Sequence, residues 1–81
     1  MNKKECYVLI CHYCTGDDGV MVYWKESDAY RTMIEDMENE IAYLQREGYE
    51  FVSAENFDSA ELYVPDTDIY FDWHIVKTII E

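Results

Sequence analysis

The segment that most constrains the fold is residues 28–47, where apolar side chains recur at spacings of three and four. They line one face of a helix: Ala29, Tyr30, Met33, Ile34, Met37, Ile41 and Leu44. Ser27 is expected to cap the helix N-terminus, Asp28 to complement the helix dipole, and Gly48 to end the helix. A helix with one apolar stripe must bury that stripe, so the rest of the chain has to supply a flat apolar sheet face.

Five other segments have the β-branched, aromatic and apolar residues typical of strands. They are residues 6–14, 20–24, 49–55, 60–64 and 69–80, separated by turn formers at residues 15–19, 56–59 and 65–68. The first segment is apolar enough to predict a central strand with both faces covered. The last segment alternates, with Phe71 and Trp73 on one face and Tyr70 and Asp72 on the other.

The order of these elements predicts an α+β fold, ββαβββ, in which a mainly antiparallel five-stranded sheet carries the helix on one face. With 81 residues the chain is expected to form one domain, residues 1–81, with residues 1–5 as a flexible N-terminus. The predicted core consists of Leu9, Val22, Met33, Met37, Ile41, Leu44, Val64, Phe71 and Trp73.

The charge of the chain restricts its partners. Eighteen acidic and six basic side chains give a net charge of −12, which argues against direct binding to nucleic acid or to an anionic membrane, because both need clustered Lys and Arg. The apolar run at residues 6–10 is too short for a signal peptide or a membrane span, so a cytoplasmic protein is expected. The excess of carboxylates favours a basic partner.

The three cysteines suggest free thiols rather than disulfides. Cys11 and Cys14 form a C-x-x-C motif, but residues three apart on a strand point to opposite faces, which does not suit zinc. No helix begins at this motif, so a thioredoxin-like redox role is not predicted. The cysteines are interpreted as buried structural residues, with no metal and no cofactor.

No catalytic constellation is recognisable. The three serines lack the context of a nucleophile, no glycine-rich phosphate loop is present, and His74 fits a sheet residue better than a general base. The paired aspartates in the turn at residues 15–19 lack the spaced oxygen ligands of a calcium loop. The chain is therefore not expected to be an enzyme.

The distribution of the carboxylates is the most informative feature. Residues 47–76 contain no Lys or Arg and eight acidic residues, and on the helix Asp36, Glu40 and Glu47 share one flank. Carboxylates two apart on a strand are about 6.6 Å apart, and those at i, i+4 on a helix are about 6 Å apart, which is the scale of phosphate spacing along one strand of nucleic acid. Tyrosines between them could act as anchors. The predicted partner-binding residues are Asp36, Glu40, Glu47, Glu50, Glu61, Tyr63, Asp66, Asp68, Tyr70 and Asp72.

In small size, strong negative charge, abundant tyrosine and helix-on-sheet layout, the chain resembles the small acidic phage-encoded inhibitors of host nucleases, the anti-CRISPR and anti-restriction DNA mimics. The resemblance covers the general character of the whole chain and no individual motif, and these inhibitors share no single fold. It implies stoichiometric occlusion of a basic surface on a CRISPR effector or restriction nuclease, inside a bacterial host cell, without catalysis.

Three alternatives remain open at the level of sequence. The carboxylates could form a solvated face that only keeps the protein soluble. The chain could be an acidic regulatory or structural domain that forms a homodimer through an edge strand, supplied by residues 7–14 or 69–80. It could also be a small metal- or metabolite-binding module that uses Cys6, Cys11, Cys14 and the two histidines.

Overall fold

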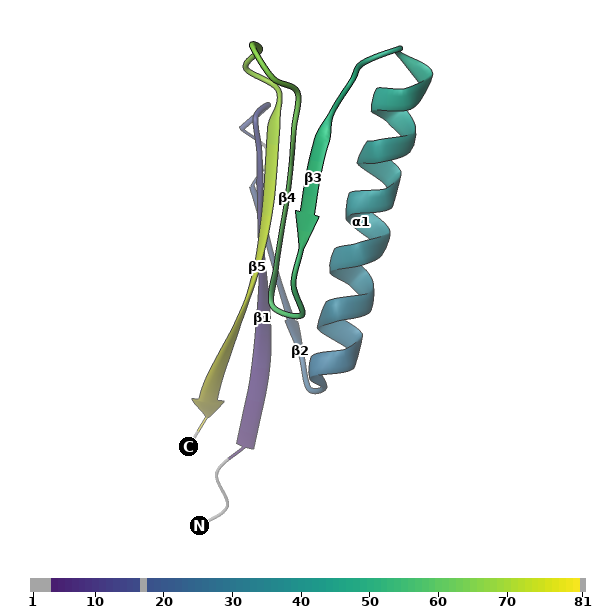
Figure 1. Cartoon of the computed structure of the whole chain (residues 1–81). Helices are drawn as coiled ribbons and strands as arrows, with labels where there is room; N and C mark the ends of the chain where they lie inside the picture. Colours follow the sequence, from purple (N-terminus) through teal and green to yellow (C-terminus); the bar gives the residue numbers. More distant parts are fainter. Residues whose placement is uncertain (1–3, 17, 81) are drawn as a thin grey trace.

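The computed structural model describes residues 4–16 and 18–80, with the side chain of residue 80 left undescribed. The elements follow the predicted order, with one helix and five antiparallel strands in a single sheet (Figure 1). Their bounds are β1 Lys4–Tyr13, β2 Gly19–Tyr23, α1 Glu26–Arg46, β3 Val52–Glu55, β4 Ser59–Tyr63 and β5 Tyr70–Ile80. The predicted α+β fold, ββαβββ with the helix on one sheet face, is confirmed.

The first and the last described strands, β1 and β5, are neighbours in the interior of the sheet. The strand order is β2-β1-β5-β4-β3, and β1 pairs with β5 along its whole length, from Lys4↔Ile80 to Tyr13↔Phe71. The edge strands are therefore β2 and β3. Residues 7–11 and 70–74 are paired on both sides, so the expectation that residues 7–14 or 69–80 supply a free edge for dimer formation is wrong at these positions, whereas residues 76–80 of β5 pair with β1 alone among the described strands.

Helix α1 begins shortly after β2 and ends, as the sequence predicted, just before Gly48. Its N-cap is Lys25, so the prediction of Ser27 is wrong; Ser27 lies inside the first turn, and the amides of Asp28 and Ala29 donate to the Lys25 carbonyl. At the other end Gly48 has φ +79°, and the Tyr49 amide donates to the Leu44 carbonyl at 2.9 Å. This left-handed residue closes the helix C-terminus in the way that favours glycine.

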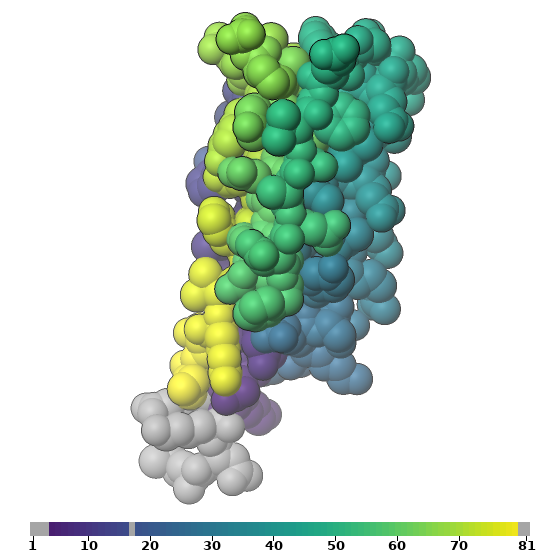
Figure 2. All heavy atoms as spheres, viewed as in Figure 1, coloured from purple at the N-terminus to yellow at the C-terminus, as the bar shows by residue number. Residues whose placement is uncertain are grey.

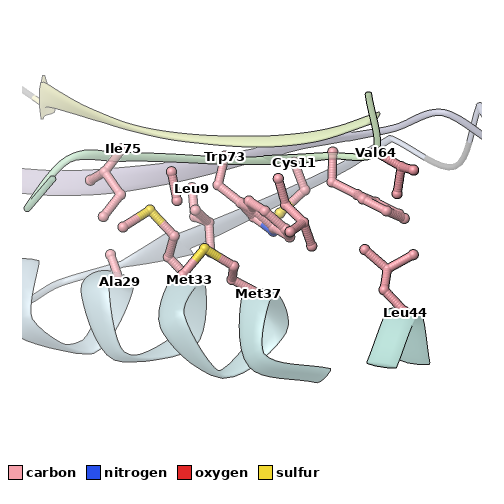
Figure 3. Close-up of a cluster of buried hydrophobic side chains, with 12 residues drawn as sticks. Leu9, Cys11, Ala29, Met33, Met37, Leu44, Val64, Trp73 and Ile75 are labelled. Atoms are coloured by element: carbon pink, nitrogen blue, oxygen red, sulfur yellow. The ribbon is translucent and has the colours of Figure 1, made fainter. Parts of the chain in front are cut away.

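The core lies between α1 and the sheet face formed by β1, β5 and β4 (Figure 3). Trp73 is fully buried at its centre, with the Phe71 ring stacked 6.3 Å away and the Tyr13 ring edge-on at 6.1 Å. Of the predicted core residues, those found buried are Leu9, Met33, Met37, Leu44, Val64, Phe71 and Trp73. Ile41 is only partly buried.

Val22 does not belong to the core, because 59% of its surface is exposed. In the β1–β2 register Val22 pairs with Val8 and Met21 pairs with Leu9. Strand alternation then places Val22 on the face opposite to that of buried Leu9. The prediction that both faces of the first strand are covered holds only in part: α1 covers the face with Leu9 and Cys11, and on the other face Cys6 is buried, Val8 and Ile10 are half-buried and His12 is exposed.

Two further expectations differ from the structure, and one falls partly outside the described residues. Lys4 and Glu5, expected in a flexible N-terminus, lie in β1, where Glu5 pairs with Lys77 at 3.1 Å; residues 1–3 are outside the described part of the chain. The third strand begins at Val52 instead of residue 49, because Val52 already pairs with Tyr63, the last residue of β4. The first hairpin turn includes residue 17, which is also outside the described residues.

The cysteines were predicted to be buried free thiols. All three are free, and Cys6 and Cys11 are buried, but Cys14 is exposed because β1 ends one residue before it. The structural role assigned to Cys14 is therefore wrong.

Candidate protein-binding surface

The sheet face that α1 leaves uncovered, called the open face below, carries four of the predicted partner-binding residues. On β5, Tyr70 and Asp72 alternate with the buried Phe71 and Trp73, so they point to the open face. The β4–β5 register places Tyr63 directly opposite Tyr70 and Glu61 directly opposite Asp72. These four residues, Glu61, Tyr63, Tyr70 and Asp72, form the acidic half of the open face.

Asp72 is the centre of the acidic half. Its carboxylate accepts a hydrogen bond at Oδ2 from the Tyr70 hydroxyl at 2.9 Å, and the His74 Nε2 lies 3.9 Å from the same oxygen. The side chain is 18% exposed. Its second oxygen, Oδ1, is buried and accepts no hydrogen bond from the described residues. A buried carboxylate oxygen without a donor is costly and favours a ligand that donates.

The hydrogen bond to Asp72 and the carboxylate charges fix the state of Tyr70. Both the bond to Asp72 and the nearby charges of Asp72 and Glu61 raise the pKa of Tyr70, because they favour the protonated phenol. Tyr70 therefore stays a donor to Asp72, and its ring remains beside the two carboxylates, where 42% of its surface is exposed. A tyrosine ring next to carboxylates offers both stacking area and negative charge to a cationic side chain.

A cavity of about 270 Å³ opens in this region of the open face. Glu61, Tyr70, Asp72 and His74 line it, together with small side chains from β3, β4 and the turn between them: Ala54, Asn56, Ser59 and Ala60. Among the described ion pairs, no Lys or Arg reaches Glu61 or Asp72. The cavity thus has two carboxylates on its wall and no strong cation among the described residues beside them.

Four more of the predicted residues lie at one end of the molecule. Glu47 and Glu50 are in the α1–β3 connection, and Asp66 and Asp68 are in the β4–β5 connection. Figure 2 shows both connections, teal-green and yellow-green, at the top end, away from the end where β1 starts and β5 finishes. All four residues are exposed, and they extend the negative surface beyond the Tyr63–Tyr70 pair.

The β4–β5 connection holds its aspartates in a defined turn. The Thr67 hydroxyl donates to the Val64 carbonyl at 2.8 Å and accepts from the Ile69 amide at 3.1 Å. Asp66 follows a proline and has φ +62°, the conformation of the third residue of a type II turn. The turn therefore presents Asp66 from an ordered backbone.

Asp36 and Glu40 lie elsewhere, on the helix side of the sheet. Asp36 is partly buried and its Oδ2 accepts from the Tyr13 hydroxyl at 3.4 Å. Burial raises the pKa of Asp36, with a smaller contribution from Glu35, and burial together with Asp36 raises the pKa of Glu40. Burial and the Asp36 charge raise the pKa of Tyr13 to about 12. The structure thus separates Asp36 and Glu40 from the acidic half of the open face by the thickness of the sheet.

Two features of the surface were not predicted from the sequence. His74 and Ser59 pair with each other across β4 and β5 and line the cavity, because strand alternation places them on the same face as Glu61 and Asp72. A second cavity, of about 590 Å³, lies on the helix side and is lined by side chains that include Tyr43 and Ile69. No group of three or more His, Cys, Asp or Glu side chains in residues 4–16 and 18–80 is arranged to hold a metal ion.

Comparison with protein families, with curated proteins and with solved structures gave no match. The fold and surface together define a small single-helix α+β domain with an acidic, partly aromatic sheet face. None of the helices in the described part of the chain is long and apolar enough to span a membrane.

Proposed function

We propose that this chain is a non-catalytic inhibitor that binds the basic, nucleic-acid-binding surface of a partner protein and excludes its DNA or RNA. The contact surface is the acidic half of the open face together with the acidic connections at the adjoining end. This is the mode of action of the anti-CRISPR and anti-restriction DNA mimics that the sequence resembles, and a CRISPR effector or restriction nuclease has the kind of partner surface required.

The observation that carries the proposal is the Glu61–Asp72 pair. Like charges directly opposite on neighbouring strands destabilise a sheet, and one Asp72 oxygen is buried without a donor. A lysine or arginine of a partner would neutralise the repulsion and donate to that oxygen in one step. Hydrogen bonds between a cation and a carboxylate are the strongest that proteins form at interfaces, so the free protein is preorganised for a cationic side chain.

The charge of the whole molecule supports the same partner. A net charge of −12 attracts a cationic channel over long range and speeds association, and this effect weakens as salt rises. Tyr63 and Tyr70 supply the local anchors that a tight complex needs beside the charges. Asp36 and Glu40 are left out of the proposed surface, because they are partly buried on the opposite side of the sheet.

The test uses purified nucleases, an RNA-guided effector and a restriction enzyme, each assayed for DNA cleavage with increasing amounts of the protein. The test variant is Glu61→Gln with Asp72→Asn, and the matched control is Glu35→Gln with Glu38→Gln, which removes the same charge from exposed helix positions. Losing one or two charge-assisted contacts should weaken inhibition by roughly tenfold to a hundredfold, whereas the control should stay within about twofold.

Partners outside these two enzymes are found by affinity capture from cells that encode defence nucleases, with the test variant as the negative bait. Each captured protein is then assayed for competition with its own nucleic acid. Should both variants bind like the parent while remaining folded, the carboxylates serve only solubility, and the proposal is wrong.

A further inference from the structure

The second cavity, called the helix-side cavity below, lies at the end of the sheet that β2 does not reach. Gly19, the first residue of β2, pairs with Cys11, so Tyr13 extends beyond β2 while it still pairs with Phe71 of β5. Side chains from α1 close the other side of the cavity. Its volume of about 590 Å³ lies within the range of about 300–1,000 Å³ that is usual for small-molecule sites.

Three of the side chains that line the helix-side cavity are aromatic, namely Tyr13, Tyr43 and Phe71. The rings of Tyr13 and Phe71 meet edge to face, with their centroids 5.6 Å apart and their planes at 68°. The faces of aromatic rings carry partial negative charge and attract cations. The protein already uses Tyr43 in this way, because the guanidinium carbon of Arg46 lies 5.8 Å from the centroid of the Tyr43 ring.

Glu40 adds a full negative charge to the aromatic wall. Its side chain is half-buried, and none of the described ion pairs joins it to a Lys or Arg. Burial raises the pKa of the Glu40 carboxyl, and the charge of Asp36, one helical turn earlier, raises it further. Asp36 accepts a hydrogen bond from the Tyr13 hydroxyl at 3.4 Å. Two carboxylates that repel each other therefore lie beside the same cavity.

We infer that the helix-side cavity binds a small organic cation, an ammonium group attached to an apolar body that contains a ring. The ammonium group donates to the Glu40 carboxylate, in a hydrogen bond that is strong because both groups are charged. Its positive charge also offsets the repulsion between Glu40 and Asp36. The ring of the ligand packs against Tyr43, Phe71 and Ile69, which form the apolar part of the wall.

Other kinds of occupant fit the cavity less well. An anion is repelled by the carboxylates, and a metal ion finds no group of three His, Cys, Asp or Glu ligands in the part of the chain that the structure describes. A lysine side chain of a partner protein has the right charge, but its flexible stem loses more conformational entropy on burial than a ring does. The inference goes beyond the proposed function, because the open face lies on the opposite side of the sheet.

The first experiment titrates isotope-labelled protein with 2-phenylethylamine, a cation at neutral pH, and follows the backbone amide signals by nuclear magnetic resonance. Two probes with a similar body are the controls: neutral 2-phenylethanol and anionic 3-phenylpropanoate. The amine should bind at least about tenfold more tightly than the alcohol, and the anion should show no binding. The signals that shift should include Tyr13, Tyr43 and Phe71. Shifts at Glu61 and Asp72 instead would place the cation on the open face and overturn the inference.

The second experiment separates a defined site from the general attraction of cations to a chain with charge −12. Glu40→Gln removes the charge from the cavity wall and should weaken binding of 2-phenylethylamine about tenfold, while binding of 2-phenylethanol changes less than about twofold. The matched control is Glu38→Gln, which removes the same charge from an exposed position of α1. It should change the affinity for the amine less than about twofold. Equal effects of the two substitutions would contradict the inference.

The third experiment tests the aromatic wall. Tyr43→Leu keeps an apolar side chain but removes the ring, so the affinity for 2-phenylethylamine should fall about threefold to tenfold. Tyr30→Leu makes the same replacement near the other end of α1, at a tyrosine of similar exposure, and should have no effect. Circular dichroism checks that each variant is folded. Equal affinities of the parent for the amine and the alcohol, or tighter binding of Nα-acetyl-lysine amide than of 2-phenylethylamine, would also overturn the inference.

Discussion

Replacing Glu61 by lysine should make the free protein more stable while it removes partner binding. Glu61 and Asp72 are directly opposite on β4 and β5, and no described Lys or Arg pairs with either. A like-charged cross-strand pair costs about 0.2–1 kcal/mol. Glu61→Gln removes that cost, and Glu61→Lys converts it to an attraction of similar size, for a total gain of roughly 0.4–2 kcal/mol. The new ammonium group can also donate to the unpaired Asp72 oxygen.

The gain is large enough to measure by urea unfolding. A domain of this length has a free energy of unfolding of about 4–12 kcal/mol, and its slope in urea is about 1 kcal/mol per M. The midpoint should therefore rise by about 0.4–2 M at low salt. Fluorescence of the buried Trp73 together with far-ultraviolet circular dichroism follows the transition.

The control must carry the same change of net charge, since any Glu→Lys substitution reduces the self-repulsion of a chain with charge −12. Glu38→Lys does so from an exposed position on α1, away from Asp72. The specific gain is the difference between the two variants, and it should shrink in 1 M salt, where the screening length is about 3 Å. Equal midpoints for the two variants, or a difference that salt leaves unchanged, would refute the electrostatic reasoning about the Glu61–Asp72 pair.

Three further perturbations test the fold and the helix side. Met37→Asp places an unpaired charge at a position where the side chain is 4% exposed, which costs several kcal/mol, so cooperative urea unfolding should be lost. The control Ala42→Asp, on the exposed face of the helix, should still unfold cooperatively. Gly48→Ala should cost about 1–2 kcal/mol in chemical unfolding because φ is +79°, while Gly19→Ala, which meets neither a positive φ nor a close neighbour, should not destabilise comparably. Asp36→Asn should raise stability at pH 7. Burial raises the folded-state pKa of the Asp36 carboxyl above its ordinary 3.8, so ionisation of this group destabilises the folded state as pH rises. Thermal unfolding should therefore show a gain in the variant that vanishes below about pH 4, where Asp36 is protonated in both states.

The strands and helix could be predicted because their patterns are local. The helix stripe, Gly48 and the alternation of residues 69–80 each depend on neighbours a few positions away. The Glu61–Asp72 pair was also within reach, because a turn at residues 65–68 makes residues 64 and 69 neighbours and fixes the β4–β5 register. This register identifies Glu61 and Asp72 as one site, whereas the sequence analysis named them only as separate members of the set of predicted partner-binding residues.

The central β1–β5 pair could not be predicted from such local signals. β1 and β5 are far apart in the sequence, and neither segment by itself indicates that it will pair with the other. The helix-side cavity was missed for the same reason, since Tyr13 and Phe71, which both line it, meet only through this long-range pairing. The mistaken burial of Val22 has a simpler cause: Leu9 and Val22 were placed in the core together, although the register puts them on opposite faces.

The pairing of β1 with β5 also determines when the complete sheet can form during synthesis of the chain. Strand β1 lacks its β5 partner until Tyr70–Ile80 has been synthesised. Before that, β2 is the strand that pairs with β1, over five positions. Closing so long a loop is entropically slow, and folding of sheets with distant pairings takes milliseconds to seconds. Until then β1 has a free edge toward the missing β5, and an unpaired strand edge is prone to aggregation. Only when Tyr70–Ile80 has been made can β5 pair with β1 on one side and with β4 on the other, which completes the sheet.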